Sequence, residues 1–473
     1  MVKFYPYIAG NFVEGEESLC IRNPFTDEMV GETSYISDVQ YEMAVERALK
    51  IRQVALEWPI FKRYESLMYI ASSMENQLEE FTELLCQEAG KPYRHSHTEV
   101  LRAIQTFKIA AEESKRLPAE YLSIDWTEAG QGKEAWVKYF PIGLVAGISP
   151  FNFPLNLAVH KIAPAIAAGC PIILKPSSQT PLSTLALARI IDESEVPKGM
   201  VSILPMQRHK GERLVSDSRI NLLSFTGSAE VGWSLKSRAG NKRVILELGG
   251  NAGMIVTPSA DIELAVKKAV SSGFAYSGQI CIHTQRIFVH STILNEFIEK
   301  LLPQVTALKF GNPLDPSTDI SVMIDADNAI RVENWVNEAL SNGAHLLCGG
   351  HRRNNYYEPT ILTHTHSQMK VWAKEIFGPV VILEPYTTLD EAINMVNCSD
   401  YGLQAAVFTS NLHELDYSFQ HLEVGGVIIN DAPTFRVDHM PYGGVKLSGL
   451  GREGVKYAIR DMLEPRILVK NYY

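Results

Sequence analysis

The sequence contains few cysteines and shows no pairing pattern among them. Its 473 residues include six cysteines that lie far apart, with no CxxC pair and no spacing typical of metal ligands. This pattern favours a reducing compartment, argues against a disulfide framework and predicts no bound metal. The segment MVKFYPYIAGNFVEGEE at the start becomes polar and acidic too early for the apolar core of a signal peptide. We therefore expect a cytoplasmic protein.

Long apolar runs and an excess of positive charge are also missing. The uncharged stretch 139–159 is interrupted by Pro141, Pro150 and Pro154 and is followed by Lys161. Short apolar runs cut by proline and glycine are typical of buried strands and turns, so we expect no membrane partner. Lysine and arginine number 44 against 54 acidic residues, which gives a net charge of −10. This balance argues against a nucleic-acid partner.

The pattern of apolar residues indicates an α/β protein. Residues 36–116 show helical periodicity, and apolar strands then alternate with helices up to the segment LELGGNAG. A second alternating series follows it, from ADIELAVKKAVSSGFAYSG to AAVFTS. Such alternation predicts two doubly wound, Rossmann-like α/β domains. The cleft between two such domains is the expected ligand site.

Four short segments carry candidate chemistry, and each also has an ordinary structural interpretation. Cys281 in GQICIHTQR is either a small core residue or a nucleophile. Glu247 ends an apolar strand, where a carboxylate needs hydrogen bonds or a function. Asn152 in ISPFNFPLN can donate to an oxyanion or satisfy a turn. The strand-to-helix turn at Gly227 and Ser228 suits a pyrophosphate, but an ordinary corner has the same pattern.

Seven segments, taken together and in order, resemble the aldehyde dehydrogenase superfamily. They are SPFNFPLN, LKPSSQTPLS, SFTGSAEVG, LELGGNAG, GQICIHTQR, EIFGPV and MPYGGVKLSGLGREG. The resemblance extends nearly end to end, and the step of 34 residues from Glu247 to Cys281 is the family's customary one. It implies the aldehyde dehydrogenase fold and NAD(P)-dependent oxidation of an aldehyde to its acid.

The resemblance also implies catalytic roles. The Cys281 thiolate would attack the aldehyde carbonyl, since the thiolate is the nucleophilic form. The Asn152 side chain and the Cys281 backbone N–H would hold the oxyanion. Glu247 would activate the water that hydrolyses the thioester. Lys161 and Glu453 would form a proton path behind Glu247, or a structural ion pair.

The implied cofactor is NAD or NADP. Lys175 and Glu375 correspond to the residues that hold the two riboses, and Phe377 borders the nicotinamide. Ser178 stands where NAD-preferring relatives often carry an acidic residue that repels a 2′-phosphate, so NADP is allowed. Arg208 and Lys210 can add attraction or be solvated loop charges. The remaining expected cofactor residues are Ser149, Pro150, Phe151, Gly227, Ser228, Gly232 and Leu248.

The expected substrate is a small aldehyde that is polar or anionic. FRVDHMPYGGVK is similar to a branch that includes lactaldehyde, sulfolactaldehyde, phosphonoacetaldehyde and non-phosphorylating glyceraldehyde-3-phosphate dehydrogenases. Polar or basic residues are predicted to converge on the substrate entrance, although each can instead be a structural ion-pair partner. The predicted entrance residues are Arg102, His160, His283, Arg436 and His439.

The resemblance also suggests domain limits and assembly. We expect a cofactor domain over 1–122 and 142–248 and a catalytic domain over 249–446. Residues 123–141 and 460–473 match the family's oligomerisation arm and tail, which predicts a homodimer or homotetramer.

Two other functions remain open at this level. One is an acylating, coenzyme A-dependent aldehyde dehydrogenase, which the presence of Glu247 disfavours. The other is a non-catalytic binding protein on the same fold.

Overall fold

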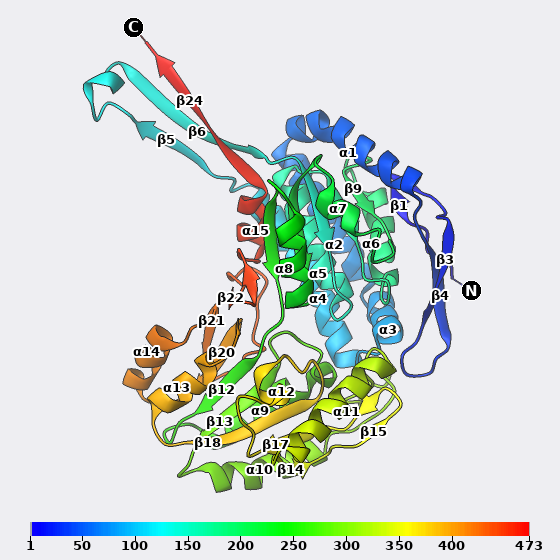
Figure 1. Cartoon of the computed structure of the whole chain (residues 1–473). Coiled ribbons are helices and arrows are strands. Elements are labelled where there is room, and N and C mark those ends of the chain that lie inside the picture. Colours follow the sequence, from blue (N-terminus) through cyan, green and yellow to red (C-terminus); the bar gives the residue numbers. More distant parts are fainter. Residues whose placement is uncertain (1, 473) are drawn as a thin grey trace.

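A computed structural model describes residues 2–472, and its first domain is built on an eight-stranded sheet (Figure 1). The strand order is β2-β1-β9-β8-β7-β10-β11-β23. The five central strands from β9 to β11 are parallel, and the strands at both edges are antiparallel. The strands are β1 Tyr7–Ile8, β2 Asn11–Phe12, β7 Leu144–Ile148, β8 Ile172–Lys175, β9 Val201–Ile203, β10 Ile220–Thr226, β11 Arg243–Glu247 and β23 Gly449–Leu450.

Helices cover both faces of this sheet through two separate apolar clusters. One cluster joins the sheet to α2–α6 and α15, and the other joins it to α1, α7 and α8. A capping box between Ser37 and Gln40 fixes the start of α1. These helices are α1 Asp38–Glu57, α2 Ile60–Asn76, α3 Leu78–Ala89, α4 Tyr93–Ser114, α5 Pro154–Ala168, α6 Leu182–Glu193, α7 Glu212–Ser216, α8 Ala229–Arg238 and α15 Val455–Asp461.

The path of the chain through the sheet positions the candidate site. From β7 the chain moves outward through β8 and β9, then returns to the other side of β7 and continues through β10 and β11. The direction of winding therefore reverses between β7 and β10, and ligands of such sheets bind beyond the carboxyl ends of the strands at this point. β7 leads into residues 149–153, and β10 leads into Gly227 and Ser228.

The second domain contains a seven-stranded sheet of order β14-β17-β18-β13-β12-β20-β21, parallel except for β14. Two further apolar clusters cover its faces. The predicted fold class is thereby confirmed. The strands are β12 Ala252–Val256, β13 Thr284–His290, β14 His345–Cys348, β17 Thr360–Thr363, β18 Val380–Tyr386, β20 Gln404–Phe408 and β21 Gly426–Ile429. The helices are α9 Ile262–Phe274, α10 Leu294–Thr306, α11 Ala326–Ser341, α12 Lys370–Ala373, α13 Leu389–Asn397 and α14 Leu412–His421.

A three-stranded antiparallel sheet extends away from the two domains (Figure 1). It consists of β5 Ala119–Ser123, β6 Lys133–Pro141 and the C-terminal β24 Leu463–Asn471. The tail, which has no evident partner nearby in the sequence, pairs with β6 along its whole length, from Leu463 opposite Pro141 to Asn471 opposite Lys133. Trp126, Ile467 and Leu468 are exposed on this arm.

The uncharged stretch 139–159 is divided among four pieces of structure. It forms the end of β6, strand β7, the loop over 149–153 and the first part of α5. Within residues 2–472, no helix has both the length and the apolar character needed to cross a membrane. Short pairs complete the fold: β3 Glu17–Arg22 with β4 Met29–Tyr35, β15 Arg352–Arg353 with β16 Tyr356–Tyr357, and β19 Tyr401–Gly402 with β22 Val445–Lys446.

Candidate active site

A strained turn between α9 and β13 positions Cys281. Tyr276, Ser277 and Gly278 all have positive φ, at 47°, 53° and 70°. Side chains resist this conformation, so surrounding contacts must hold it. The Tyr276 hydroxyl donates to the Ala89 carbonyl at 2.9 Å, and the Ser277 hydroxyl donates to the Ser321 carbonyl at 2.7 Å. The turn places Cys281 in the wall of a cavity of about 680 Å³.

A buried ion pair connects this turn to the opposite wall of the cavity. Lys91 and Glu99 are both fully buried and bind each other. The Lys91 ammonium lies 3.8 Å from the ring centroid of Phe153 and 4.6 Å from that of Tyr276. Glu99 also accepts two backbone N–H groups from the first turn of α5, at 3.0 and 3.1 Å. The loop after β7 and the turn before Cys281 are therefore fixed relative to each other.

Asn152 lies in that loop with 5% of its surface exposed. Its amide nitrogen donates to the backbone carbonyl of Gln279 at 2.9 Å. An amide nitrogen carries two donors, so one N–H remains after this bond. Asn152 and Cys281 line the same cavity. The remaining N–H is suited to an oxyanion formed beside the sulfur.

Glu247 ends β11 and also lines the cavity. Its Oε1 accepts the backbone N–H of Glu453 at 3.2 Å, and its Oε2 has no partner among residues 2–472. Burial and the negative charge of Glu453 raise the pKa of Glu247 well above its usual range. A buried carboxyl of raised pKa is the environment that general bases commonly have.

Glu453 is surrounded by basic side chains behind Glu247. Arg436 Nη2 lies 2.5 Å from Glu453 Oε1, and Lys161 Nζ lies 4.0 Å from Oε2. His160 Nδ1 is 3.4 Å from Oε1. Burial alone would raise the pKa of Glu453, but His160, Arg436 and Lys161 lower it to about 2. Lys161 also donates to the Thr226 hydroxyl at 2.7 Å, so both predicted relay residues lie directly behind Glu247.

Asp438 joins the two arginines predicted to lie at the substrate entrance. Arg102 Nη2 and Nε donate to its carboxylate at 2.6 and 3.2 Å, and His160 Nε2 lies 2.8 Å from it. Arg436 Nε lies 3.9 Å from the same carboxylate. Against the effect of burial, these contacts hold the pKa of Asp438 well below its usual range. Both arginines line the cavity.

The three predicted histidines differ from the arginines in their position. His160 is buried behind the cavity wall, in contact with Asp438 and Glu453. His283 is also buried, and burial lowers its pKa to about 4, so it carries no charge near neutral pH. His439 is exposed. Since these histidines lie outside the cavity lining, the positive charge at the entrance comes from Arg102 and Arg436.

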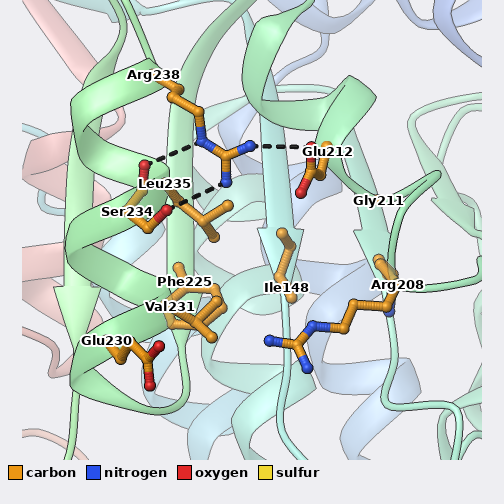
Figure 2. Close-up of a pocket in the computed structure, with 11 residues that line it drawn as sticks. Ile148, Arg208, Gly211, Glu212, Phe225, Glu230, Val231, Ser234, Leu235 and Arg238 are labelled. Atoms are coloured by element: carbon orange, nitrogen blue, oxygen red, sulfur yellow. Dashed lines mark hydrogen bonds and ion pairs between the residues drawn. The ribbon is translucent and has the colours of Figure 1, made fainter.

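A second, smaller cavity of about 260 Å³ lies between β7, β10 and α8 (Figure 2). Lys175 and Arg208 line it, and Figure 2 shows Arg208 reaching into it. Burial and the nearby Arg208 charge lower the pKa of Lys175 to about 8. Arg238, by contrast, is bound to Glu212 at 2.9 Å and to the Ser234 carbonyl at 3.2 Å. Within the described part of the chain, Arg208 forms no ion pair, so its charge is free for a ligand.

The residues between these cavities fit a dinucleotide. Ser228 is the N-cap of α8 but makes no side-chain capping bond, which leaves backbone N–H groups at the helix start for a pyrophosphate. Pro150, Gly227, Ser228 and Leu248 line the large cavity, and Gly232 packs against Leu248 so closely that a Cβ would lie 2.3 Å from its side chain. Ser149 is buried, and Ser178 donates to the Met206 carbonyl at 3.5 Å.

Glu375 and Phe377 border the opposite side of the large cavity. Glu375 accepts the Gly250 backbone N–H at 3.0 Å, and burial raises its pKa to about 7. Phe377 has a φ of 47° and packs edge-on against Phe151, with ring centroids 5.9 Å apart. Most of the predicted cofactor residues therefore line the cavity that also contains Cys281, and Lys175 lines the smaller one, whereas Ser149, Ser178 and Gly232 line neither.

Sequence reasoning missed several residues of the cavity wall. Tyr442 lies within the quoted segment MPYGGVK, yet no pattern in the sequence indicates that its hydroxyl lies 3.1 Å from Cys281 Sγ. Arg331 and Trp335 come from α11, a helix without a recognisable motif. Tyr401 and Thr434 also line the cavity.

Comparison with known proteins identifies the family. The aldehyde dehydrogenase family profile matches residues 12–468. The chain belongs to the aldehyde dehydrogenase family. The expected enzyme class, an NAD(P)-dependent aldehyde dehydrogenase, and the expected branch are thereby confirmed.

Relatives of this aldehyde dehydrogenase resemble it over nearly their whole length. It is 42% identical to a 3-sulfolactaldehyde dehydrogenase of Priestia aryabhattai, covering 98% of this chain and 97% of the relative. Aldehyde dehydrogenase 21 of Physcomitrella patens, solved with the reaction product succinate, has a TM-score of 0.98 and 41% identity, covering 99% and 98%. Glyceraldehyde-3-phosphate dehydrogenase of Methanocaldococcus jannaschii, solved with NADP, has a TM-score of 0.93 and 38% identity, covering 96% and 99%.

The turn before Cys281 leaves no space for a side chain at Gly278. A Cβ there would lie 2.0 Å from the Gly378 carbonyl oxygen, whereas a Cβ at Gly240, whose φ is 61°, would have no atom within 4 Å. We expect Gly240→Ala to destabilise by about 1–2 kcal/mol through its φ alone. Gly278→Ala should cost a further 1–3 kcal/mol, roughly, through overpacking. The costs are compared by measuring the thermal unfolding midpoints of the two variants. Equal midpoints would contradict the steric restriction at Gly278.

Proposed function

We propose that this enzyme oxidises a small anionic aldehyde to its acid through a Cys281 thioester that water hydrolyses with Glu247 as base. The observation that carries this proposal is the meeting of Cys281, Asn152, Glu247, Arg102 and Arg436 around one cavity. These side chains come from separate parts of both domains. Their common cavity supports one shared reaction better than independent structural roles.

The first chemical step forms a bond between Cys281 Sγ and the aldehyde carbon. The carbonyl electron pair moves to oxygen, where the free N–H of Asn152 and the Cys281 backbone N–H stabilise it. Collapse of this adduct to the thioester expels the hydride of the former aldehyde carbon, for which NAD(P), when bound, would supply the acceptor. The thioester carbon is then attacked by water, whose proton passes to Glu247, and the C–S bond breaks to release the acid and the thiolate.

Charge at the entrance supports an anionic substrate. Arg102 and Arg436 both line the cavity, and each contacts one carboxylate of low pKa, Asp438 and Glu453 respectively. A guanidinium carries five N–H donors, so each arginine has donors left for a substrate anion. The names and bound product of the three relatives refer to a sulfonate, a carboxylate and a phosphate.

The same arrangement disfavours the two alternatives. An acylating enzyme passes its thioester to coenzyme A and does not need a base such as Glu247 at the cavity wall. A pure binding protein does not need Cys281, Asn152 and Glu247 to face one another.

We also propose that the enzyme accepts NADP as well as NAD, and that the smaller cavity holds the 2′-phosphate of NADP. Arg208 and Lys175 present positive charge there. Glu212 and Glu230 also line the cavity, and Glu212 is paired with Arg238. Ser178, in the loop after β8, introduces no further repelling carboxylate. The NADP bound to the Methanocaldococcus jannaschii relative agrees with this assignment.

Replacement of the base separates the two halves of the reaction. Glu247→Gln keeps the shape but cannot accept a proton from water, so we expect an NAD(P)H burst followed by slow turnover. In the wild type, steady turnover should rise with pH as Glu247 ionises, because its raised pKa keeps it protonated at lower pH. Stopped-flow absorbance measures both phases.

Cys281→Ala is the matched control, and we expect it to lose both the burst and the turnover. Near-normal turnover without Cys281 would reject the proposed mechanism. Fast steady turnover in Glu247→Gln, with no preceding burst, would exclude Glu247 as the deacylation base.

Removal of an entrance arginine should lower kcat/KM more for anionic substrates than for neutral ones. A charge-assisted hydrogen bond contributes about 1.5–3 kcal/mol, which corresponds to roughly a ten- to hundredfold change in kcat/KM. Arg436→Leu and Arg102→Leu should therefore lower kcat/KM for succinic semialdehyde or glyceraldehyde 3-phosphate far more than for propanal. Arg94→Leu, on the same helix as Arg102 but bound to Asp319, is the matched control. Equal losses with charged and neutral aldehydes would reject the anion site.

We propose a homodimer or homotetramer assembled through the arm. The arm exposes apolar side chains along β24, and a small sheet of this kind gains stability when another chain covers it. Sedimentation velocity should show a species of two or four chains. Leu468→Lys should weaken it, whereas Val39→Lys, an exposed change on α1, should not. A monomer at every protein concentration would contradict the assembly.

A further inference from the structure

Tyr442 touches the reacting sulfur but has no role in the reaction described above. Its hydroxyl lies 3.1 Å from Cys281 Sγ, a hydrogen-bonding distance when sulfur is one of the two atoms. No other group among residues 2–472 hydrogen bonds to this hydroxyl. Tyr442 belongs to the wall of the large cavity, so the contact lies where the aldehyde carbon must arrive.

The tyrosine ring is held firmly in this position. The backbones of Tyr442 and Glu453 exchange two hydrogen bonds, of 2.8 and 2.5 Å. The ring packs in a small apolar cluster with Ile282 and Leu403, and 3% of the residue is exposed. Arg436 lies over the ring face, with its guanidinium carbon 3.8 Å from the centroid. The backbone pairing and the packing on the ring together hold the hydroxyl beside the sulfur.

The direction of the hydrogen bond follows from the charge state of the sulfur. A thiolate has no proton to give, so in the nucleophilic state the phenol must be the donor. Burial raises the pKa of Tyr442 well above its usual range, which keeps the phenol protonated. The cation over the ring draws electron density toward itself and makes the O–H a stronger donor.

We propose that Tyr442 is a further catalytic residue, which stabilises the Cys281 thiolate by donating a hydrogen bond. Arg436, which lies over the ring of Tyr442, strengthens this bond. This inference rests on the proposed role of Cys281 as nucleophile. It gives Arg436 a second effect on the reaction, in addition to binding the substrate anion.

The electrostatic surroundings of the sulfur show why such a donor is needed. Burial raises the pKa of Cys281 to about 11, and the carboxyl groups of Glu375 and Glu247 oppose the thiolate as well. The hydrogen bond from Tyr442 and the charge of Arg436 are the two influences that favour it. Tyr442 makes direct contact with the sulfur, whereas Arg436 acts across the ring.

The test is the pH dependence of Cys281 alkylation in Tyr442→Phe. Brief pulses of iodoacetamide at pH 7 to about 12.5 span the pKa of about 11 and the expected rise. Labelling is quantified on the peptide that contains Cys281, because the exposed Cys20 and Cys398 also react. A hydrogen bond to a charged group contributes about 1.5 kcal/mol or more, and one pKa unit corresponds to about 1.4 kcal/mol. We therefore expect the inflection of the profile to rise by about one pH unit. Thiolate nucleophilicity increases with pKa with a Brønsted slope of about 0.4–0.5. Labelling below the inflection should therefore fall by only about threefold.

Three comparisons separate this role from structural damage. Tyr386→Phe removes another buried tyrosine hydroxyl, which donates to the Val256 carbonyl at 3.1 Å, and it should leave the inflection unchanged. Labelling of the buried Cys86 and Cys170 reports unfolding. 3-Fluorotyrosine at position 442 keeps the ring and supplies a more acidic phenol, so it should lower the inflection.

An unchanged inflection in Tyr442→Phe, or an equal shift in Tyr386→Phe, would overturn the proposal. The NADPH burst at pH 7 then tests the catalytic consequence, and we expect it to slow by about threefold. Loss of the burst in Cys281→Ala tests the nucleophile itself, so failure of the proposed function and failure of the Tyr442 assignment give different results. An altered inflection with an unaltered burst rate would overturn the catalytic role and leave only a contact to the sulfur.

Discussion

The carboxylate of Glu453 imposes the constraint on which the site depends. A buried carboxylate is very unfavourable unless cations and hydrogen bonds compensate for its lost hydration. Arg436, Lys161 and His160 surround it, and their positions are consequently fixed. The backbone of the same residue holds Oε1 of Glu247 and pairs with Tyr442. One buried charge thus determines where the proposed base, the arginine proposed to bind the substrate anion and the tyrosine lie.

The ion pair of Lys91 and Glu99 has the corresponding effect on the opposite wall. Its ammonium packs between Phe153, next to Asn152, and Tyr276, which begins the turn to Cys281. The proposed oxyanion donor, Asn152, belongs to the first domain and the proposed nucleophile, Cys281, to the second. A contact that spans both domains keeps the distance between them constant, and a small error in such a distance costs catalysis heavily.

Much of this arrangement follows from local patterns in the sequence, and the rest depends on contacts between distant segments. Alternating strands and helices predicted the two α/β domains, because the apolar periodicity of each element is local. The motifs predicted Cys281, Glu247 and Asn152 as candidates. The sequence could not indicate that Asp438 binds both Arg102 and His160, which lie 336 and 278 residues before it. Nor could it show that burial removes His283 from the entrance, since exposure depends on the packing of the whole domain.

The pairing of the C-terminal strand is another feature that local patterns in the sequence do not predict. Its apolar alternation indicates a strand, but the choice of β6 as partner requires the chain to return across more than three hundred residues. That return also brings β23 beside β11 and the backbone of Glu453 against Glu247, and α15 then packs on α5 and leads directly into β24. The pairing of the arm and the placement of the charge behind Glu247 are therefore parts of one chain path. A change that frees β24 from β6 acts on the segment that carries Glu453, so the proposed assembly and the proposed deacylation share a structural element.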